Sequence, residues 1–339
     1  YQTDDVGLQL NIGGRGLDPR RSSNFNVRQN NYDISADPLG YPETYYSPPF
    51  ECLENIQLIR GAGSLQYGTQ FGGLVNFNIK KPTRNHSLEA VIRNTLGSNN
   101  FYSNFTSLSG TLKKFGYYTF FNYKKGDGFR SNSDFKSYNF YSFLNYDLSK
   151  KINFSFEFTY LNYLAQQPGG LTDAMFYDNI FQSNRERNWF EVNWLLYNFQ
   201  FSYDITDNTN WSINSFILDA HRYAVGFRSN RVDQVDSFME RDLIKSDFNN
   251  FGLETKIFHQ SRFCKKKLVS LLGLKIYSGS NSTRQGPGST DSDPDFNFQS
   301  TIFPNYESQS NYSNPNLNYS IFNENIFYLN DRMSIVPGF

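Results

Sequence analysis

The chain has 339 residues, including 34 Phe and 24 Tyr, and its 32 basic and 32 acidic residues cancel. A net charge of zero gives no reason to expect a nucleic-acid partner. The mean hydropathy is −0.60, and no stretch approaches the roughly 18 apolar residues that a transmembrane helix needs. An aromatic-rich chain without long apolar runs suits alternating strands instead.

Cysteine and histidine are too sparse and too scattered to build a metal centre. Cys52 and Cys264 fall in different predicted regions, and two cysteines make neither a disulfide framework nor a metal spacing. The three histidines form no cluster, so we expect two free thiols, no metal site and no intrinsic cofactor. The chain begins at Tyr1 without a leader and ends inside a predicted strand, so we expect it to be part of a larger protein.

Residues 1–82 are predicted to form a small, loop-rich first unit. Short strands are expected at 8–12, 25–27 and 32–34, separated by turns rich in Gly, Pro and Asp, with one helical turn at 50–55. A unit of this size buries little apolar surface by itself. We therefore expect it to depend on a surrounding structure.

The stretch 56–82 reads as strand, glycine turn, short helical turn, glycine turn and strand. Two phosphate-binding motifs begin in the same way. A dinucleotide fingerprint needs a third glycine where Gln66 stands, and a P-loop needs Lys-Ser/Thr where Thr69 and Gln70 stand. No crossover helix follows, so the sequence does not predict nucleotide binding.

From residue 86 onward the hydrophobic pattern changes to a period of two. In the clearest strand, Ile152, Phe154, Phe156, Phe158 and Tyr160 share one face, which we expect to contact lipid, while the polar residues between them line a lumen. The predicted strands are 87–96, 101–111, 115–125, 135–147, 152–160, 190–204, 210–224, 247–259, 268–280, 318–329 and 333 onward.

The predicted connections alternate in length. Short ones are 113–114, 148–151, 206–209, 260–267 and 330–332, and long ones are 126–134, 166–188, 227–246 and 281–315, with a surface helix expected within 171–187. Short turns on one side and long loops on the other are typical of an outer-membrane barrel. We count about eleven strands, and because closed single-chain barrels have an even number, we expect more strands beyond Phe339.

Two motifs in the first unit resemble the plug of TonB-dependent outer-membrane transporters. The stretch 56–82 fills the pattern I-x-x-I-R-G-x-x-S-x-x-Y-G followed by V-N-x-x-x-K-K-P, and residues 12–16 carry an Arg-Gly pair after a short strand. Residues 40–49 and 66–73 are most similar to the ferric-dicitrate receptor branch. The resemblance covers the first unit closely and the remainder only as a pattern.

The resemblance implies an all-β transmembrane antiparallel barrel with an N-terminal α+β plug in its lumen. Residues 1–82 would be the plug, and residues 86–339 roughly the first half of the barrel. The implied function is active uptake of a ferric chelate, with ferric dicitrate as the ligand of that branch, across the bacterial outer membrane. The implied partners are TonB with its inner-membrane complex, the chelate, and outer-membrane lipid and lipopolysaccharide.

Other functions stay open from the sequence. One alternative within the family is TonB-dependent import of a glycan, a peptide or cobalamin. The others are a passive porin, which would lack a folded plug, and a surface protein that uses the barrel as an anchor for binding partners. No nucleophile elbow, zinc-binding histidine pair or motif-borne carboxylate pair is present, so the sequence does not predict an enzyme.

Arg15 and Arg60 match the two plug arginines of the family, and the resemblance implies that they pair with barrel glutamates. An arginine buried between plug and wall would be costly without such a partner. Bidentate pairing would then make a lock that can be released. The alternative is an ordinary solvated arginine, and the sequence does not identify the partner carboxylates.

The candidate ligand-binding residues are polar and aromatic side chains in turns and loops. Arginine suits a polycarboxylate iron chelate through charge-assisted hydrogen bonds, although any one of these side chains is equally well explained as a solvated loop residue. The plug candidates are Asp18, Arg20, Arg21, Tyr45, Tyr46, Gln70 and Phe71, and the barrel candidates are Arg222, Arg228, Arg231 and Arg284. Asn314-Pro315-Asn316-Leu317 resembles a tetrapeptide of haem-receptor loops, but no histidine follows His259, so we assign it no role.

Overall fold

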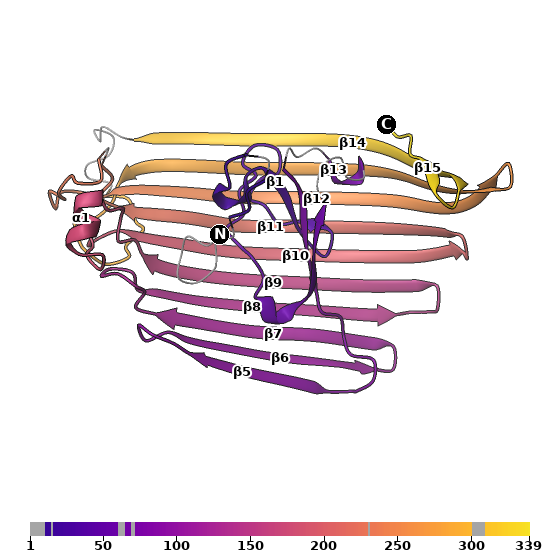
Figure 1. Ribbon diagram of the computed structural model, residues 1–339, viewed down its shortest axis with the longest axis horizontal. Helices are drawn as coiled ribbons and strands as arrows, with labels where there is room; N and C mark the ends of the chain where they lie inside the picture. Colours follow the sequence, from indigo (N-terminus) through magenta and orange to yellow (C-terminus); the bar gives the residue numbers. More distant parts are fainter. Residues whose placement is uncertain (1–10, 15, 60–64, 69–71, 230, 300–308) are drawn as a thin grey trace.

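The chain forms two β-sheets of very different size (Figure 1). The computed structural model describes residues 11–14, 16–59, 65–68, 72–229, 231–299 and 309–339. Four short strands make a small mixed sheet, and the following eleven make one large antiparallel sheet. No helix in these described ranges is long and apolar enough to cross a membrane.

The small sheet has the strand order β2-β1-β4-β3, and β1 and β4 run parallel. Asn30 and Asn31 make the turn from β1 to β2 with φ of 45° and 73°, a left-handed conformation that asparagine adopts more readily than most residues. A Cβ on Gly72 would lie 2.6 Å from the Asn24 carbonyl oxygen, so glycine is needed where β4 meets β1. The strands are β1 (Phe25–Gln29), β2 (Tyr32–Asp33), β3 (Leu53–Ile59) and β4 (Gly73–Ile79), with single 3₁₀ turns at Arg20–Ser22, Phe50–Cys52 and Leu65–Tyr67.

The large sheet is an uninterrupted meander in which each strand pairs with its sequence neighbours. Its strands are β5 (Glu89–Leu96), β6 (Tyr102–Leu112), β7 (Phe115–Gly126), β8 (Phe135–Asp147), β9 (Ile152–Gln166), β10 (Trp189–Thr206), β11 (Thr209–Gly226), β12 (Asp242–Phe263), β13 (Lys266–Pro287), β14 (Ser310–Asn330) and β15 (Met333–Ile335). The eleven strands agree with the number counted from the sequence.

The connections alternate as the sequence predicts. The tight turns gather at one end of the sheet and the long connections, with α1 (Asp173–Asp178), at the other (Figure 1). In the two-residue turn between β12 and β13, Cys264 and Lys265 have φ of 48° and 63°, as a type I′ hairpin requires. The helix expected within 171–187 is only six residues long, capped by Thr172, whose hydroxyl accepts from the Met175 amide.

The long connection predicted for 281–315 is wrong at both ends. Strand β13 continues to Pro287 and β14 already begins at Ser310, so the two ladders extend well beyond the predicted strands. The added segments are rich in Asn, Ser and Thr and carry no apolar alternation. Backbone hydrogen bonds hold a strand together without that alternation, so the period-two pattern marks only part of each strand.

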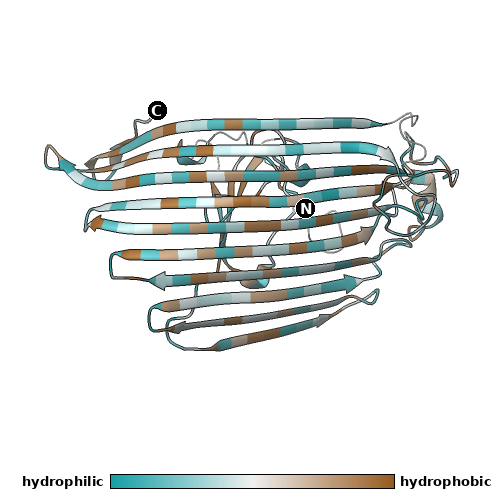
Figure 2. Cartoon of the chain, turned by 180° about the vertical axis from the view of Figure 1, so that it is seen from behind, coloured by the Kyte–Doolittle hydropathy of each residue, from teal (hydrophilic) through white to brown (hydrophobic). Residues whose placement is uncertain are grey.

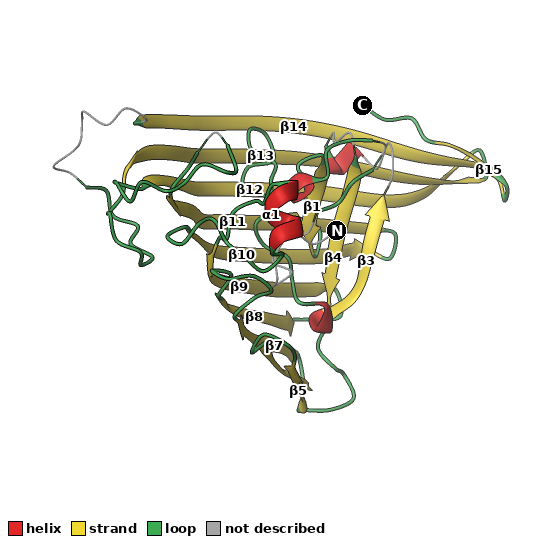
Figure 3. Cartoon of the chain, turned by 60° about the vertical axis from the view of Figure 1, so that its left-hand side comes forward, coloured by secondary structure: helices red, strands yellow, loops and turns green. Residues whose placement is uncertain are grey.

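The two faces of the large sheet differ as the alternation predicts, and Figure 2 shows the resulting bands along the strands. In β9 the side chains of Ser155, Glu157 and Thr159 are buried, whereas Phe156 is 41 % exposed. The small sheet lies across the buried face of the large one, and Figure 3 shows β3 and β4 in front of it. The polar inner face therefore contacts the first unit, and the apolar outer face is left exposed.

Aromatic residues of the first unit pack on the inner face of the large sheet. The Tyr45 ring lies 6.1 Å from Phe190 and 6.0 Å from Trp194. Ile34, Tyr45 and Trp194 have no measurable exposure. This shared core fixes the position of residues 32–46 against β10–β12, and so determines which side chains meet at the site described next.

Candidate functional site

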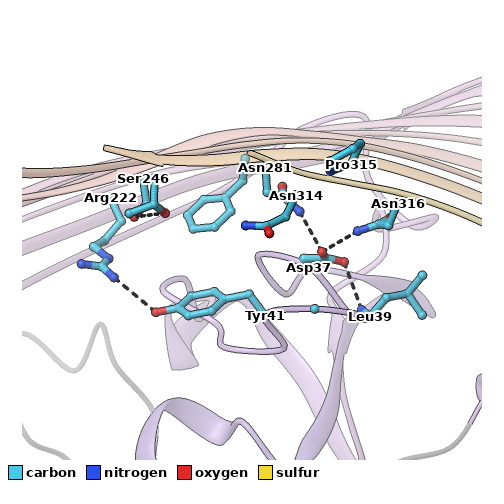
Figure 4. Close-up of a pocket in the computed structure, with 12 residues that line it drawn as sticks. Asp37, Leu39, Tyr41, Arg222, Ser246, Asn281, Asn314, Pro315 and Asn316 are labelled. Carbon is cyan, nitrogen blue, oxygen red and sulfur yellow. Dashed lines mark hydrogen bonds between the residues drawn. The ribbon is translucent and has the colours of Figure 1, made fainter. Parts of the chain in front are cut away.

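A cavity of about 470 Å³ lies between the turn at residues 37–41 and the inner face of strands β11–β14 (Figure 4). Its wall residues lie near the strand ends that the long connections join, such as Arg222 near the end of β11 and Ser246 near the start of β12. The cavity is therefore in the half of the sheet nearer those connections. Polar side chains dominate its lining, and Tyr41 and Phe248 provide an aromatic part with ring centroids 5.7 Å apart.

The strand register arranges the cavity wall in cross-strand rows. Arg222 lies opposite Ser246, which lies opposite Thr283. Two residues further from the long connections, Phe248 lies opposite Asn281, which lies opposite Asn314. Another two residues on, the row is Asn250, Gly279 and Asn316. Neighbouring rows share one face because the side-chain period of a strand is two.

The buried carboxylate of Asp37 joins the turn to the wall. Tyr277 Oη donates to its Oδ1 at 3.0 Å, and the amides of Asn281 and Asn316 donate to Oδ2 at 2.7 and 2.6 Å. The Leu39 backbone amide completes the set at 3.0 Å. Four neutral donors thus satisfy a side chain that is only 1 % exposed, as a buried charge requires.

Arg222 is the cationic group of the wall. Its Nη2 donates to Tyr41 Oη at 3.3 Å, and its guanidinium lies 5.6 Å from the Tyr45 ring centroid. Its buried Nε has no hydrogen-bond acceptor, and it makes no ion pair, within the described part of the chain. A guanidinium that lines a cavity and has no carboxylate partner among the described residues is suited to bind an anion.

Arg21 lies on the other side of the same tyrosines but is already paired. Its Nη1 contacts Glu43 Oε2 at 2.5 Å and Tyr45 Oη at 2.7 Å. Burial opposes the charge on Arg21, yet Tyr45 and Glu43 outweigh burial and raise its pKa. Burial also raises the pKa of the Tyr45 phenol well above its ordinary value, against the opposing effect of Arg222. The phenol therefore stays neutral beside two cations.

The structure brings three of the predicted ligand-binding residues together: Arg21, Tyr45 and Arg222. Tyr46 lies elsewhere, fully buried, and donates to Gln29 Oε1 at 3.0 Å. Asp18 and Arg20 contact each other at 3.8 Å on the surface. The remaining predicted arginines lie outside the cavity lining: Arg228 is exposed, Arg231 pairs with Asp233 and Arg284 pairs with Asp247.

Four predicted site residues, Arg15, Arg60, Gln70 and Phe71, lie outside the described residues. The lock proposed for the first two therefore stays a prediction. Within the described ranges, no group of three or more His, Cys, Asp or Glu side chains is placed to hold a metal ion. Cys52 is buried and Cys264 is exposed, and both thiols are free.

A different arginine joins the two sheets by an ion pair. Arg28 of β1 is fully buried, and its Nη1 lies 3.5 Å from Oε1 of Glu254 in β12. Lys275 and Lys256 contact the same carboxylate at 3.2 and 3.6 Å. Arg28 also donates to Asn26 Oδ1 at 2.8 Å. No role was predicted for Arg28, because a lone arginine in a short strand shows no partner in the sequence.

Glu157 of β9 is a second buried carboxylate at the junction of the two sheets. It accepts from Asn30 Nδ2 at 2.8 Å and from Tyr141 Oη at 2.9 Å. Asn198 Nδ2 lies at 3.5 Å. The alternation in β9 correctly predicts that Glu157 points inward, but it does not identify Asn30 as its partner.

No model of a known protein family matches the sequence. Solved structures do match. The unliganded ferric citrate transporter FecA has a TM-score of 0.82 at 19 % identity, over 98 % of this chain and 49 % of that one. The open form of the ferric-catecholate import receptor Fiu of Escherichia coli K12 has a TM-score of 0.70 at 11 % identity. The match covers 97 % of this chain and 53 % of that one. The outer-membrane ferripyoverdine receptor of Pseudomonas aeruginosa has a TM-score of 0.68 at 14 % identity. The match covers 93 % of this chain and 44 % of that one.

This is the plug-and-barrel fold of outer-membrane receptors. The chain spans about half the length of the receptors that it matches. The small sheet with its flanking turns takes the place of the plug, and the large sheet that of the first part of the barrel. At 11 to 19 % identity, this likeness establishes the fold. All these neighbours are named as transporters or receptors, and none as an enzyme.

Proposed function

We propose that the full-length protein imports a ferric chelate across the bacterial outer membrane in a TonB-dependent step. The carrying observation is the cavity between plug and barrel wall, where Arg222 lies beside Tyr41 and has no carboxylate partner among the described residues. The cavity lies toward the end with the long connections, which face outward in barrels of this type. A chelate arriving from outside would meet the Arg222 row first.

In this proposal residues 1–82 act as the plug and residues 86–339 as the first part of the barrel. Arg222 and the Arg21–Tyr45 pair would hold the anionic part of the chelate by charge-assisted hydrogen bonds. Arg15 and Arg60, together with the Arg28–Glu254 pair, would hold the plug until TonB acts on it. Iron is the cargo here, so the protein itself needs no cofactor.

Ferric dicitrate is the first compound to test, because the sequence resembles that receptor branch and the ferric citrate transporter has the same fold over 98 % of the chain. A passive porin is less well supported. Turns of the first unit make buried hydrogen bonds to the wall through Asp37 and Asn30, and these would hold a plug inside the lumen. A pore for free diffusion has no use for such contacts.

Growth under iron limitation tests the proposal. The full-length protein would be expressed in a Gram-negative host that lacks its own ferric-chelate receptors. We expect growth on ferric dicitrate or another ferric chelate, and loss of that growth when TonB is absent. Growth that is identical without TonB would favour the passive-pore alternative.

A further inference from the structure

Tyr41 is the plug residue that contacts the cation of the cavity wall, and its place depends on a carboxylate at the other end of the same turn. Resting on the proposed function, we propose that Asp37 is a positioning residue for chelate binding. It fixes the turn at residues 37–41 on the wall, so that Tyr41 holds Arg222 in place for the anionic part of the chelate. Asp37 itself does not touch the ligand, because it is only 1 % exposed.

The turn is a small closed unit. The Asp37 amide donates to the Tyr41 carbonyl oxygen and the Tyr41 amide donates to the Asp37 carbonyl oxygen, both at 2.9 Å. Within this ring Asp37 Oδ1 accepts from the Leu39 amide at 3.0 Å, as in an Asx turn. A Cβ on Gly40 would lie 3.0 Å from Asp37 Oδ2, a tight contact that glycine avoids. The position of Tyr41 therefore follows that of Asp37.

The Asp37 carboxylate attaches this unit to three residues of the wall. Tyr277, Asn281 and Asn316 each donate to it, at 3.0, 2.7 and 2.6 Å. All three belong to β13 and β14. Because a buried carboxylate without donors is costly, these hydrogen bonds hold the turn at one position on the wall.

At the other end of the turn, the direction of the hydrogen bonds makes Tyr41 an acceptor for Arg222. Tyr45 Oη donates its proton to Glu43 Oε2 at 2.8 Å, so it can only accept from Tyr41 Oη, which lies 2.7 Å away. The Tyr41 oxygen is then left to accept from Arg222, whose Nη2 lies at 3.3 Å. Stacking on Phe248, with an interplanar angle of 15°, fixes the Tyr41 ring.

Arg222 depends on this contact for its orientation. Among the described residues, Tyr41 is the one hydrogen-bond partner of its guanidinium. Figure 4 shows Arg222 at the Tyr41 end of the turn, and Asn281 and Asn316 at the Asp37 end. An arginine that is already held in its binding orientation loses less conformational freedom when the ligand arrives. Asp37 therefore contributes to the affinity for an anion that it does not contact.

Calorimetric titration of the detergent-solubilised full-length protein tests the inference, with two anionic ferric chelates, ferric dicitrate and ferric aerobactin. In Asp37→Asn the new NH₂ group faces N–H donors in either orientation of the amide, so the turn is no longer held on the wall. The affinity for the chelate that the wild type binds more tightly should fall by about twofold to tenfold, the worth of holding one long side chain in place.

A second variant weakens the attachment of the turn without altering the carboxylate. Tyr277→Phe removes one donor to Asp37, and Tyr277 is buried and does not line the cavity. The variant should therefore lower the same affinity by about twofold without removing a ligand contact.

The matched control is Asp33→Asn. Asp33 is a buried carboxylate of the plug, 3 % exposed, that accepts from the Ser35 amide within its own turn and does not line the cavity. This variant should bind both chelates like the wild type.

The double variant Asp37→Asn/Tyr41→Phe separates positioning from a general loss of stability. Tyr41→Phe keeps the stacked ring but removes the oxygen that holds Arg222. Because Asp37 acts through Tyr41, the double variant should bind no more than about twofold more weakly than the weaker-binding single variant, since non-additivity marks a shared interaction. If Asp37→Asn does not assemble, Tyr277→Phe/Tyr41→Phe gives the same comparison and should bind like Tyr41→Phe alone.

Two results would overturn the inference and leave the proposed function intact. One is that Asp37→Asn and Tyr277→Phe bind as tightly as Asp33→Asn. The other is that the losses multiply in the double variant, which would mean that Asp37 only stabilises the fold. Failure of the wild type to bind any ferric chelate would instead overturn the proposed function together with this inference.

Discussion

At the scale of single residues, the two arginines beside Tyr45 differ in what they can still bind. Arg21 is paired with Glu43 at 2.5 Å, so its charge is compensated before any ligand arrives. Arg222 contacts only phenols and has an unused, buried Nε within the described structure. The affinity for an anion should therefore depend on Arg222 more than on Arg21.

Replacing Arg222 by Gln removes the cation of the cavity wall. A hydrogen bond to a charged group is worth roughly 1.5–3 kcal/mol, so the affinity for anionic ferric chelates should fall by about tenfold to a hundredfold. Calorimetry with ferric dicitrate and ferric aerobactin measures it. Arg284→Gln is the control, because Arg284 is half exposed and already faces Asp247 at 3.8 Å. Equal effects of the two variants would remove Arg222 from the site.

The ion pair between Arg28 and Glu254 makes a second prediction. Glu254→Gln leaves Arg28, Lys256 and Lys275 close together without their carboxylate, and breaking a buried pair costs about 3–5 kcal/mol. The barrel should still assemble, because its ladders do not involve this side chain, but the plug should be held more weakly. Ion conductance in planar bilayers should therefore increase.

A surface ion pair provides the comparison for that experiment. Arg231 and Asp233 contact each other at 3.1 Å, with exposures of 75 % and 52 %, and solvated pairs of this kind contribute little. Arg231→Gln should conduct like the wild type. If Glu254→Gln conducts no more than Arg231→Gln, the Arg28–Glu254 pair does not hold the plug.

At the scale of elements, the alternation in β9 separates a lipid face from a lumen face. Phe158 is predicted to contact lipid. Gln200, on the opposite face of the neighbouring strand β10, donates to the Asn30 carbonyl oxygen of the plug at 3.4 Å. Phe158→Arg should destabilise the barrel by about 2–4 kcal/mol if it lies near the bilayer midplane. Gln200→Arg, on the polar face, should cost much less. Urea unfolding in lipid vesicles compares them, and equal losses would contradict the assignment of faces.

The buried tyrosines of the plug predict that the plug loses stability at alkaline pH. Burial raises the pKa of Tyr32, Tyr45 and Tyr46 well above the ordinary value. Their stabilising contribution is complete below about pH 10, where unfolded tyrosine is still neutral, and is lost as the pH rises above that value. Conductance should therefore increase at alkaline pH as the plug loosens, less steeply in Tyr46→Phe. A plug that stays closed through this range would argue against the prediction.

The strands and turns could be predicted where the residues next to a position in the sequence determine which face of the sheet its side chain occupies. The face of Glu157 follows from Phe156 and Phe158 on either side, and the tight turns follow from the ends of the apolar runs. Prediction failed at 281–287 and 310–317, because strands with polar residues on both faces give no period-two pattern. Strand extent there is set by the neighbouring ladder.

The site was predictable only in part, for a different reason. Arginine and tyrosine in loops suggested anion binding, and Arg21, Tyr45 and Arg222 do converge. Asn281 carried no signal, since asparagine is frequent on a polar lumen face, and Asn316 was noticed only within a tetrapeptide that was assigned no role. They meet at Asp37 because of the strand register and the position of the plug against the wall. These bring together residues more than 200 positions apart in the sequence.

At the scale of the whole molecule, plug and wall are joined by contacts of several kinds. An ion pair links β1 to β12, neutral donors hold Asp37 against β13 and β14, and Asn30 bonds Glu157 of β9. Each is broken if the plug moves as a unit. In the proposed function these contacts would have to be broken by work done on the plug, which is why we propose coupling to an energy source.

Uptake of radioactive iron by whole cells tests this claim most directly. Cells expressing the full-length protein would be given ferric dicitrate and ferric aerobactin, with and without a protonophore, and with and without TonB. We expect saturable accumulation of iron from at least one chelate, abolished by the protonophore and by loss of TonB, and reduced in Arg222→Gln. Accumulation that is unsaturable and unaffected by either treatment would contradict it.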